Sequence, residues 1–131
     1  MREPQWIFKE TILLLHEQSL NEHGGSSGLR DDGLLDSALG KPQNVHAYNA
    51  QASIFDLAAS YATGLVKNHP FIDGNKRIGF LAGALMLQLN GYHFAATEAD
   101  AAISTLALAA GEMTEAEYAA WLEKNSTPYE A

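Results

Sequence analysis

The chain has 131 residues, of which 47% are hydrophobic, and this is typical of a single globular domain spanning residues 1–131. It has no cysteine, which excludes a disulfide framework, thiolate metal ligands and a cysteine nucleophile. Its formal net charge of −8 argues against direct nucleic-acid binding, because phosphate neutralisation by Lys and Arg supplies most of that affinity.

Apolar residues recur at helical spacing over almost the whole chain. We therefore expect an all-α fold, a compact bundle of about six helices with at most one very short β element.

The first helix is expected from Pro4 to about Glu22, with a core-facing set of Ile7, Phe8, Leu14 and Leu15. Its apolar run is far too short for a signal peptide or a membrane span, so we expect a cytoplasmic protein without membrane contact. His16 is expected on the surface, because Leu20 stands where a zinc-protease helix would carry its second histidine.

The glycine- and serine-rich stretch 24–28 is expected to form a loop, after which Asp31 or Asp32 caps a short helix over about Gly33–Leu39. Lys41 and Pro42 are expected to end that helix, because proline disrupts a helix interior.

Two longer helices are predicted over residues 52–67 and 75–89. Gly79 and Gly83 lie four residues apart in the second of these, which favours close approach by a neighbouring helix. After Asn90 and Gly91 we expect a short extended piece over 92–96.

Two capped helices follow, beginning after Thr97 and Thr114. The last is expected to bury Tyr118, Trp121 and Leu122, and the tail from Ser126 is expected to be frayed.

The connection between the two longer helices reads HPFIDGNKR and carries the residues that suggest chemistry. His69 precedes a proline, so it should leave the preceding helix and present its imidazole from a non-helical backbone. Histidine titrates near neutrality and can accept a proton from an attacking hydroxyl. Phe71 is expected to anchor this loop in the core.

Asp73 is the one carboxylate of this segment, and a single carboxylate beside nucleotide phosphates is the usual protein contribution to a Mg²⁺ site. Gly74 and Asn75 open the next helix, whose first N–H groups lack internal partners and form an anion site. Lys76 and Arg77 add positive charge there. A base, a metal ligand and an anion site are what phosphoryl-type transfer requires.

Each residue alone also has an ordinary structural explanation. A histidine between helices is often a cap or a core residue, an Asp-Gly pair is usually a turn, and Asn75 at a helix start is usually a cap. Nine consecutive residues in a compatible order favour the chemical interpretation.

The segment HPFIDGNKR resembles the signature of the Fic/Doc superfamily, and the upstream stretch GLRDDGLLDSALGKPQ resembles its death-on-curing, or Doc, branch. The resemblance implies a helical bundle that binds a nucleotide at the motif loop. It implies His69 as general base, Asp73 as the magnesium-associated carboxylate, residues 74–77 as the phosphate-binding turn and Phe71 as the buried anchor. Arg30 and Asp31 would lie near the site, and Gln43–Tyr48 would form a flap over it.

Two positions depart from the broader Fic pattern: Lys76 stands where AMP-transferring members have glycine, and Phe80 where they have a second arginine. The Doc branch implies transfer of the terminal phosphate of ATP to a threonine of elongation factor Tu, with Mg²⁺, which arrests translation. It also implies a toxin whose partner is a small antitoxin with a flexible inhibitory segment. The alternatives are an AMP transferase of the same fold and a non-catalytic protein-binding module.

Overall fold

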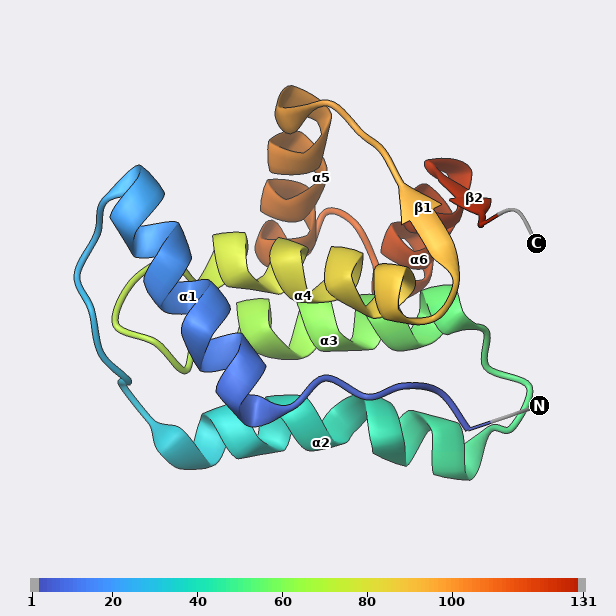
Figure 1. The fold of residues 1–131 in the computed structure, drawn as a ribbon, viewed down its shortest axis with the longest axis horizontal. Coiled ribbons are helices and arrows are strands. Elements are labelled where there is room, and N and C mark those ends of the chain that lie inside the picture. Colours follow the sequence, from blue (N-terminus) through green and yellow to red (C-terminus); the bar gives the residue numbers. More distant parts are fainter. Residues whose placement is uncertain (1–2, 130–131) are drawn as a thin grey trace.

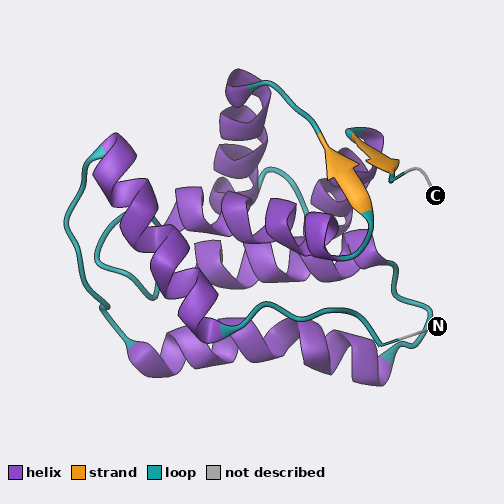
Figure 2. Cartoon of the chain, in the orientation of Figure 1, coloured by secondary structure: helices purple, strands orange, loops and turns teal. Residues whose placement is uncertain are grey.

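The computed structural model describes residues 3–129, which form six helices and one two-stranded antiparallel sheet (Figure 1 and Figure 2). The all-α prediction is confirmed. The elements are α1 (Lys9–His23), α2 (Asp32–Tyr48), α3 (Ile54–Asn68), α4 (Asn75–Leu89), β1 (Tyr92–Phe94), α5 (Glu98–Ala110), α6 (Glu115–Lys124) and β2 (Ser126–Pro128).

Helix α3 is the centre of the bundle. It contacts α2, α4, α5 and α6, and ten of its fifteen residues are buried. A helix that is apolar around most of its circumference is stable only when other elements cover it. Figure 1 shows α2 and α4 on either side of α3, with α1 crossing near the start of α4.

Helices α3 and α4 approach closely at Gly79 and Gly83, as predicted. A Cβ atom at Gly79 would lie 2.6 Å from Cγ2 of Val66, and one at Gly83 would lie 3.3 Å from the carbonyl oxygen of Ala58. Backbone and side chains of α3 therefore occupy the space that a larger residue on α4 would need.

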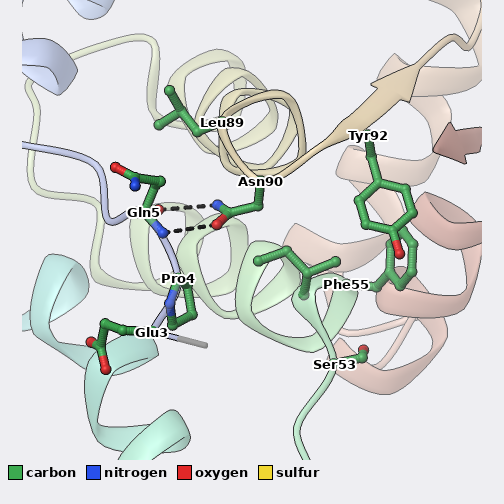
Figure 3. A pocket seen from close by; sticks show the side chains of 9 residues that line it. Glu3, Pro4, Gln5, Ser53, Phe55, Leu89, Asn90 and Tyr92 are labelled. Carbon is green, nitrogen blue, oxygen red and sulfur yellow. Dashed lines mark hydrogen bonds between the residues drawn. The ribbon is translucent and has the colours of Figure 1, made fainter. Parts of the chain in front are cut away.

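The first helix begins at Lys9, so the prediction of helix from Pro4 is wrong. The preceding residues form an extended arm whose backbone groups are satisfied by other elements. The Asn90 side chain bonds both the N–H and the C=O of Gln5, and the Tyr61 hydroxyl accepts from the N–H of Ile7. Figure 3 shows Gln5 and Asn90 beside a cavity of about 580 Å³ between the arm, the start of α3 and the end of α4.

The predicted inward face of this segment is also partly wrong. Ile7 is buried, but Phe8 and Leu14 are 74% and 70% exposed. Starting at Lys9, α1 instead buries Ile12, His16 and Ser19, which are spaced three and four apart.

Helix α2 continues through Pro42 to Tyr48, so neither the predicted end at Lys41 nor the flap over Gln43–Tyr48 is correct. Proline costs a backbone hydrogen bond here. However, Leu35, Ala38 and Pro42 form one buried face, and the burial of that face offsets the loss.

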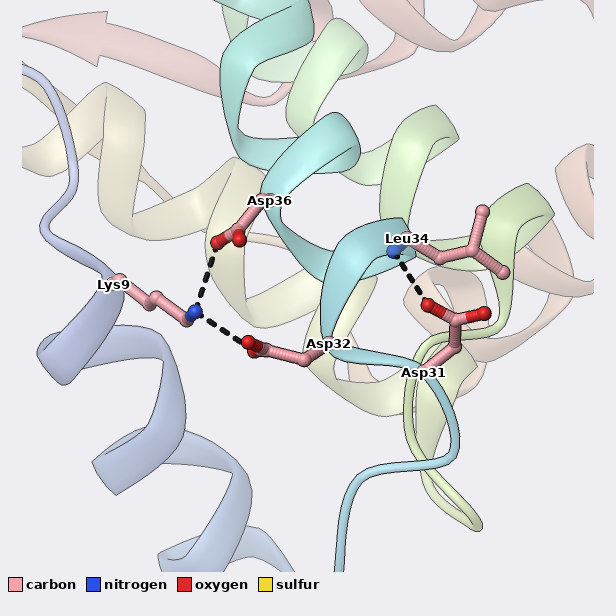
Figure 4. Close-up of polar contacts among 5 residues, drawn as sticks. All are labelled: Lys9, Asp31, Asp32, Leu34 and Asp36. Atoms are coloured by element: carbon pink, nitrogen blue, oxygen red, sulfur yellow. Dashed lines mark hydrogen bonds and ion pairs between the residues drawn. The ribbon is translucent and has the colours of Figure 1, made fainter.

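The start of α2 is fixed by charged side chains (Figure 4). Asp31 caps it by accepting from the N–H of Leu34, as one of the two predicted capping residues. Lys9 Nζ lies 2.7 Å from Asp32 Oδ1 and 2.8 Å from Asp36 Oδ1, which ties α1 to α2. The hydrogen bond to Asp32, followed by that to Asp36, raises the pKa of Lys9.

Residues 126–128 of the predicted frayed tail form the strand β2, and residues 130–131 of that prediction lie outside the described residues. β2 pairs with β1 in antiparallel register, with Tyr92 opposite Pro128 and Phe94 opposite Ser126. These three residues are held in place because they satisfy backbone groups of β1 that would otherwise be unpaired. Within residues 3–129, no helix has the length and apolarity that crossing a membrane requires.

We expect Gly79→Ala to lower the free energy of unfolding by about 1–3 kcal/mol, because the added methyl group overlaps Val66. The matched control is Gly40→Ala in α2, where, among the described residues, no atom other than the adjoining residues and backbone of the same helix lies within 4 Å of the new Cβ. The free energy of unfolding of this control should rise by about 0.5–1 kcal/mol, because alanine has a higher helix propensity and reduces the entropy of the unfolded state. Chemical denaturation measures both values, and equal effects would contradict the close approach of α3 and α4.

Candidate active site

The motif residues lie on the connection between α3 and α4 and on the first turn of α4. Figure 1 shows this connection at one end of the bundle, next to the segment that joins α1 to α2. The two connections pair through an antiparallel bridge between Leu29 and Phe71 and a hydrogen bond from the N–H of Ile72 to the carbonyl of Gly28. A loop from elsewhere in the sequence therefore supports the motif.

His69 ends α3 with an exposed side chain and a left-handed backbone, at φ 54° and ψ 52°. The prediction that it leaves the helix is confirmed. Histidine is among the non-glycine residues that tolerate this region, but the conformation still costs on the order of 1 kcal/mol. Pro70 follows, so the chain cannot continue the helix.

Phe71 is 1% exposed, which confirms it as the buried anchor. Its ring stacks on His16 with a centroid distance of 3.7 Å and an interplanar angle of 13°. The Asn75 side chain accepts from the Phe71 N–H and donates to the Phe71 carbonyl, both at 2.9 Å. Asn75 is buried and its amide is used by these two bonds, so only its backbone N–H remains to bind phosphate.

Asp73 is exposed and its carboxylate is oriented by two backbone groups. Oδ2 accepts from the N–H of Ser26 at 3.2 Å, and Oδ1 accepts from the N–H of Gly74 at 2.8 Å. His16 Nε2 donates to the Asp73 carbonyl oxygen at 2.8 Å. These contacts hold the carboxylate at the surface, where its remaining lone pairs face solvent.

This arrangement suits one kind of metal ion. Within residues 3–129, no three His, Asp or Glu side chains gather as a ready-made metal site. Mg²⁺ commonly binds proteins through one or two carboxylates and takes its other ligands from phosphate and water. An exposed Asp73 beside an anion-binding turn fits Mg²⁺ that arrives with a nucleotide.

The first turn of α4 leaves its backbone donors open. Its N-cap, Gly74, has φ 79°, a conformation that favours glycine, and within residues 3–129 no side chain caps the turn. The leading N–H groups of the helix are left without partners and carry the positive end of the helix dipole. Lys76 is exposed at this turn, and the buried Nε of Arg77 has no hydrogen-bond partner among the described residues.

A cavity of about 220 Å³ adjoins this turn between α4 and α5. It is lined by the two cations and by a mainly apolar group, Phe80, Ala101, Ala102, Thr105 and Leu106. The first turn of α4 therefore has a partly apolar hollow beside it.

Three residues that support the site were missed or given no definite role from the sequence: His16, Ser26 and Arg30. The surface prediction for His16 is wrong, since it is 3% exposed. Its spacing from Ile12 and Ser19 on one helix face was a usable signal. Ser26 acts through its backbone, for which no sequence signal exists. Arg30 does lie near the site, as the upstream resemblance implied, and contacts the motif backbone.

Removing the Asn75 side chain should destabilise the fold. Asn75→Ala leaves the N–H and C=O of Phe71 unsatisfied, and we expect a loss of about 2–4 kcal/mol in the free energy of unfolding. Asn21→Ala, at an exposed position in α1, should change it by less than about 0.5 kcal/mol. Denaturant titration of both variants checks this, and an unchanged Asn75→Ala midpoint would refute the structural role.

Comparisons with known proteins identify the family of this chain. Residues 6–87 match the Fic/DOC family, a span that includes both paired connections. The chain is 40% identical over 74 residues to a protein named Toxin Doc from Mycolicibacterium smegmatis, and the aligned residues cover 56% of this chain and 57% of that protein. It is 31% identical over 85 residues to a protein named Protein kinase doc from Escherichia phage P1, and the aligned residues cover 65% of this chain and 68% of that protein.

Proposed function

Because this chain belongs to the Fic/DOC family, we propose that it is a Doc-like toxin and a nucleotide-dependent transferase. It transfers the terminal phosphate of ATP to a threonine hydroxyl of elongation factor Tu and thereby arrests translation. The relatives support this proposal through their names, and the motif loop supports it through its geometry.

One observation carries the proposal. The uncapped first turn of α4 presents unpaired N–H groups together with Lys76 and Arg77, while His69 stands exposed at the other end of the same short loop. Five residues, 70–74, thus separate the proposed proton acceptor from the proposed phosphate-binding turn. Phosphoryl transfer depends mainly on positioning and charge neutralisation, which such a loop supplies.

The proposed reaction uses these groups as follows. The His69 imidazole accepts the proton of the threonine hydroxyl as the oxygen forms its bond to the terminal phosphorus of ATP. The bond from that phosphorus to the bridging oxygen breaks, and ADP leaves. The N–H groups of the α4 turn and the two adjacent cations stabilise the negative charge on the phosphate oxygens. Mg²⁺ bound with ATP at Asp73 would neutralise further phosphate charge.

Phosphate transfer is favoured over AMP transfer by what surrounds Phe80. Its ring lies 5.9 Å from that of Phe94 and 6.4 Å from that of Trp121, so this position belongs to an aromatic cluster. It supplies no second cation for the other phosphates of ATP. The Lys76 side chain occupies the turn where AMP-transferring members have glycine.

The same proposal includes a partner. A small antitoxin with a flexible segment would hold the toxin inactive, and the proposed target places the reaction in the cytoplasm. The net charge of −8 favours a partner segment with basic character.

The proposed activity is tested by incubating the protein with Mg²⁺, ATP and elongation factor Tu and measuring the intact mass of the target. We expect a gain of one phosphate. His69→Ala should reduce the rate by roughly 10²–10⁴-fold, because the proton acceptor is lost. Asp73→Asn should raise the Mg²⁺ concentration needed for half-maximal rate. His93→Ala, at an exposed position on β1, is the matched control and should keep the wild-type rate.

Other outcomes discriminate between the alternatives. A gain of one AMP would replace the kinase assignment by AMP transfer. Full activity in both His69→Ala and Asp73→Asn would contradict the assigned roles. An unchanged target mass, combined with normal growth of cells that express the chain without antitoxin, would favour a non-catalytic binding module.

A further inference from the structure

Arg30 binds three successive carbonyl groups at the end of α3. Its Nε donates to the His69 carbonyl at 2.7 Å, and its Nη2 donates to the Asn68 carbonyl at 2.9 Å. Its backbone N–H donates to the Pro70 carbonyl at 2.7 Å. Arg30 thus donates a hydrogen bond to the carbonyl oxygen of the His69–Pro70 peptide and to the carbonyl oxygens of the peptides before and after it.

The His69 backbone needs such support. It is the one non-glycine residue with positive φ in the described part of the chain, and Pro70 offers no N–H with which to hold the turn. No hydrogen bond fixes the His69 ring within residues 3–129. The direction in which the imidazole points is therefore set by the backbone from which it projects.

Arg30 is itself held firmly enough to act as a support. Its neighbour Leu29 forms the bridge to Phe71, and Asp31 both caps α2 and donates its N–H to the Pro70 carbonyl at 3.0 Å. Within residues 3–129, Arg30 takes part in no ion pair, so its guanidinium donors serve the carbonyls. The planar guanidinium places two donors in a fixed fork, which suits a pair of neighbouring acceptors.

We propose that Arg30 is a positioning residue, which keeps His69 in its left-handed conformation and so aims the imidazole at the acceptor hydroxyl. This inference rests on the proposed function for the role of His69. It assigns Arg30 no contact with ATP, because its Nε and Nη2 donors are used by the carbonyl groups of His69 and Asn68.

The kinetic test separates positioning from nucleotide binding. Arg30→Ala should lower kcat by roughly 10²-fold, the size of effect that misplacement by about 1 Å produces, while KM for ATP stays within about twofold. Ethylguanidinium added to Arg30→Ala should restore part of kcat, since the site is exposed and an external fork can occupy it. Ethylguanidinium should not restore kcat in His69→Ala. Arg30→Lys keeps the positive charge but lacks the two-donor fork of the guanidinium. Its kcat should lie between those of the wild type and Arg30→Ala.

Several results would overturn the proposal. An unchanged kcat in Arg30→Ala would show that His69 needs no such support. A rise in KM for ATP that matches the loss of rate would assign Arg30 to nucleotide binding. If Arg30→Ala does not fold, Arg30→Lys provides the test, and full kcat in this folded variant would refute the need for the fork.

A measurement that needs no activity separates this inference from the proposed function. NMR measures the imidazole chemical shifts of the protein, and the His69 signal is assigned by its loss in His69→Ala. In Arg30→Ala the chemical shifts of the His69 imidazole should change, while those of His93 should stay unchanged. If the wild type transfers no phosphate but this selective shift occurs, the proposed function fails and the positioning role stands. If no shift occurs, the positioning role fails whatever the activity.

Discussion

The close packing of α4 on α3 at Gly79 and Gly83 fixes both ends of the loop that carries the site. His69 is the C-cap of α3 and Gly74 is the N-cap of α4, so the spacing of the two helices sets the spacing of His69 and the first turn of α4. Because backbone atoms make part of this contact, the spacing cannot adjust through side-chain rotation. Sites on rigid elements hold their geometry better than sites on free loops.

The loop itself has no regular secondary structure, and other parts of the chain satisfy its backbone. His16 of α1 bonds the Asp73 carbonyl, Asn75 bonds both polar groups of Phe71, and Arg30 bonds the carbonyls around His69. Such groups would otherwise be costly wherever they are shielded from water. The side chains of His16, Asn75 and Arg30 therefore hold the backbone of the loop, while the side chains of His69, Asp73 and Lys76 are exposed to solvent.

The positively charged side chains also differ in their roles. The protein is acidic overall, and two pairs among its eight Lys and Arg residues have different surroundings. Lys9 and Lys41 pair with carboxylates and join helices, as in the contact of Lys41 with Glu115 at 2.6 Å. Within residues 3–129, Lys76 and Arg77 form no ion pair and lie at a helix start. Among the described residues, two cations thus remain without a carboxylate partner at a helix start in a molecule that is negative overall, which is the local charge that the proposed function uses.

The sequence by itself determined the helical class, the bounds of α4, the close approach at Gly79 and the motif from His69 to Arg77, because periodicity, caps and glycine are local signals. Only the tertiary structure decided that the arm before Lys9 is extended, that α2 passes through Pro42, and that the tail forms β2. The supporting contacts of His16, Ser26 and Arg30 also depend on it. In each case the deciding partner lies far away in the chain. Burial and hydrogen bonding across that distance outweigh local propensity, and no local pattern records them.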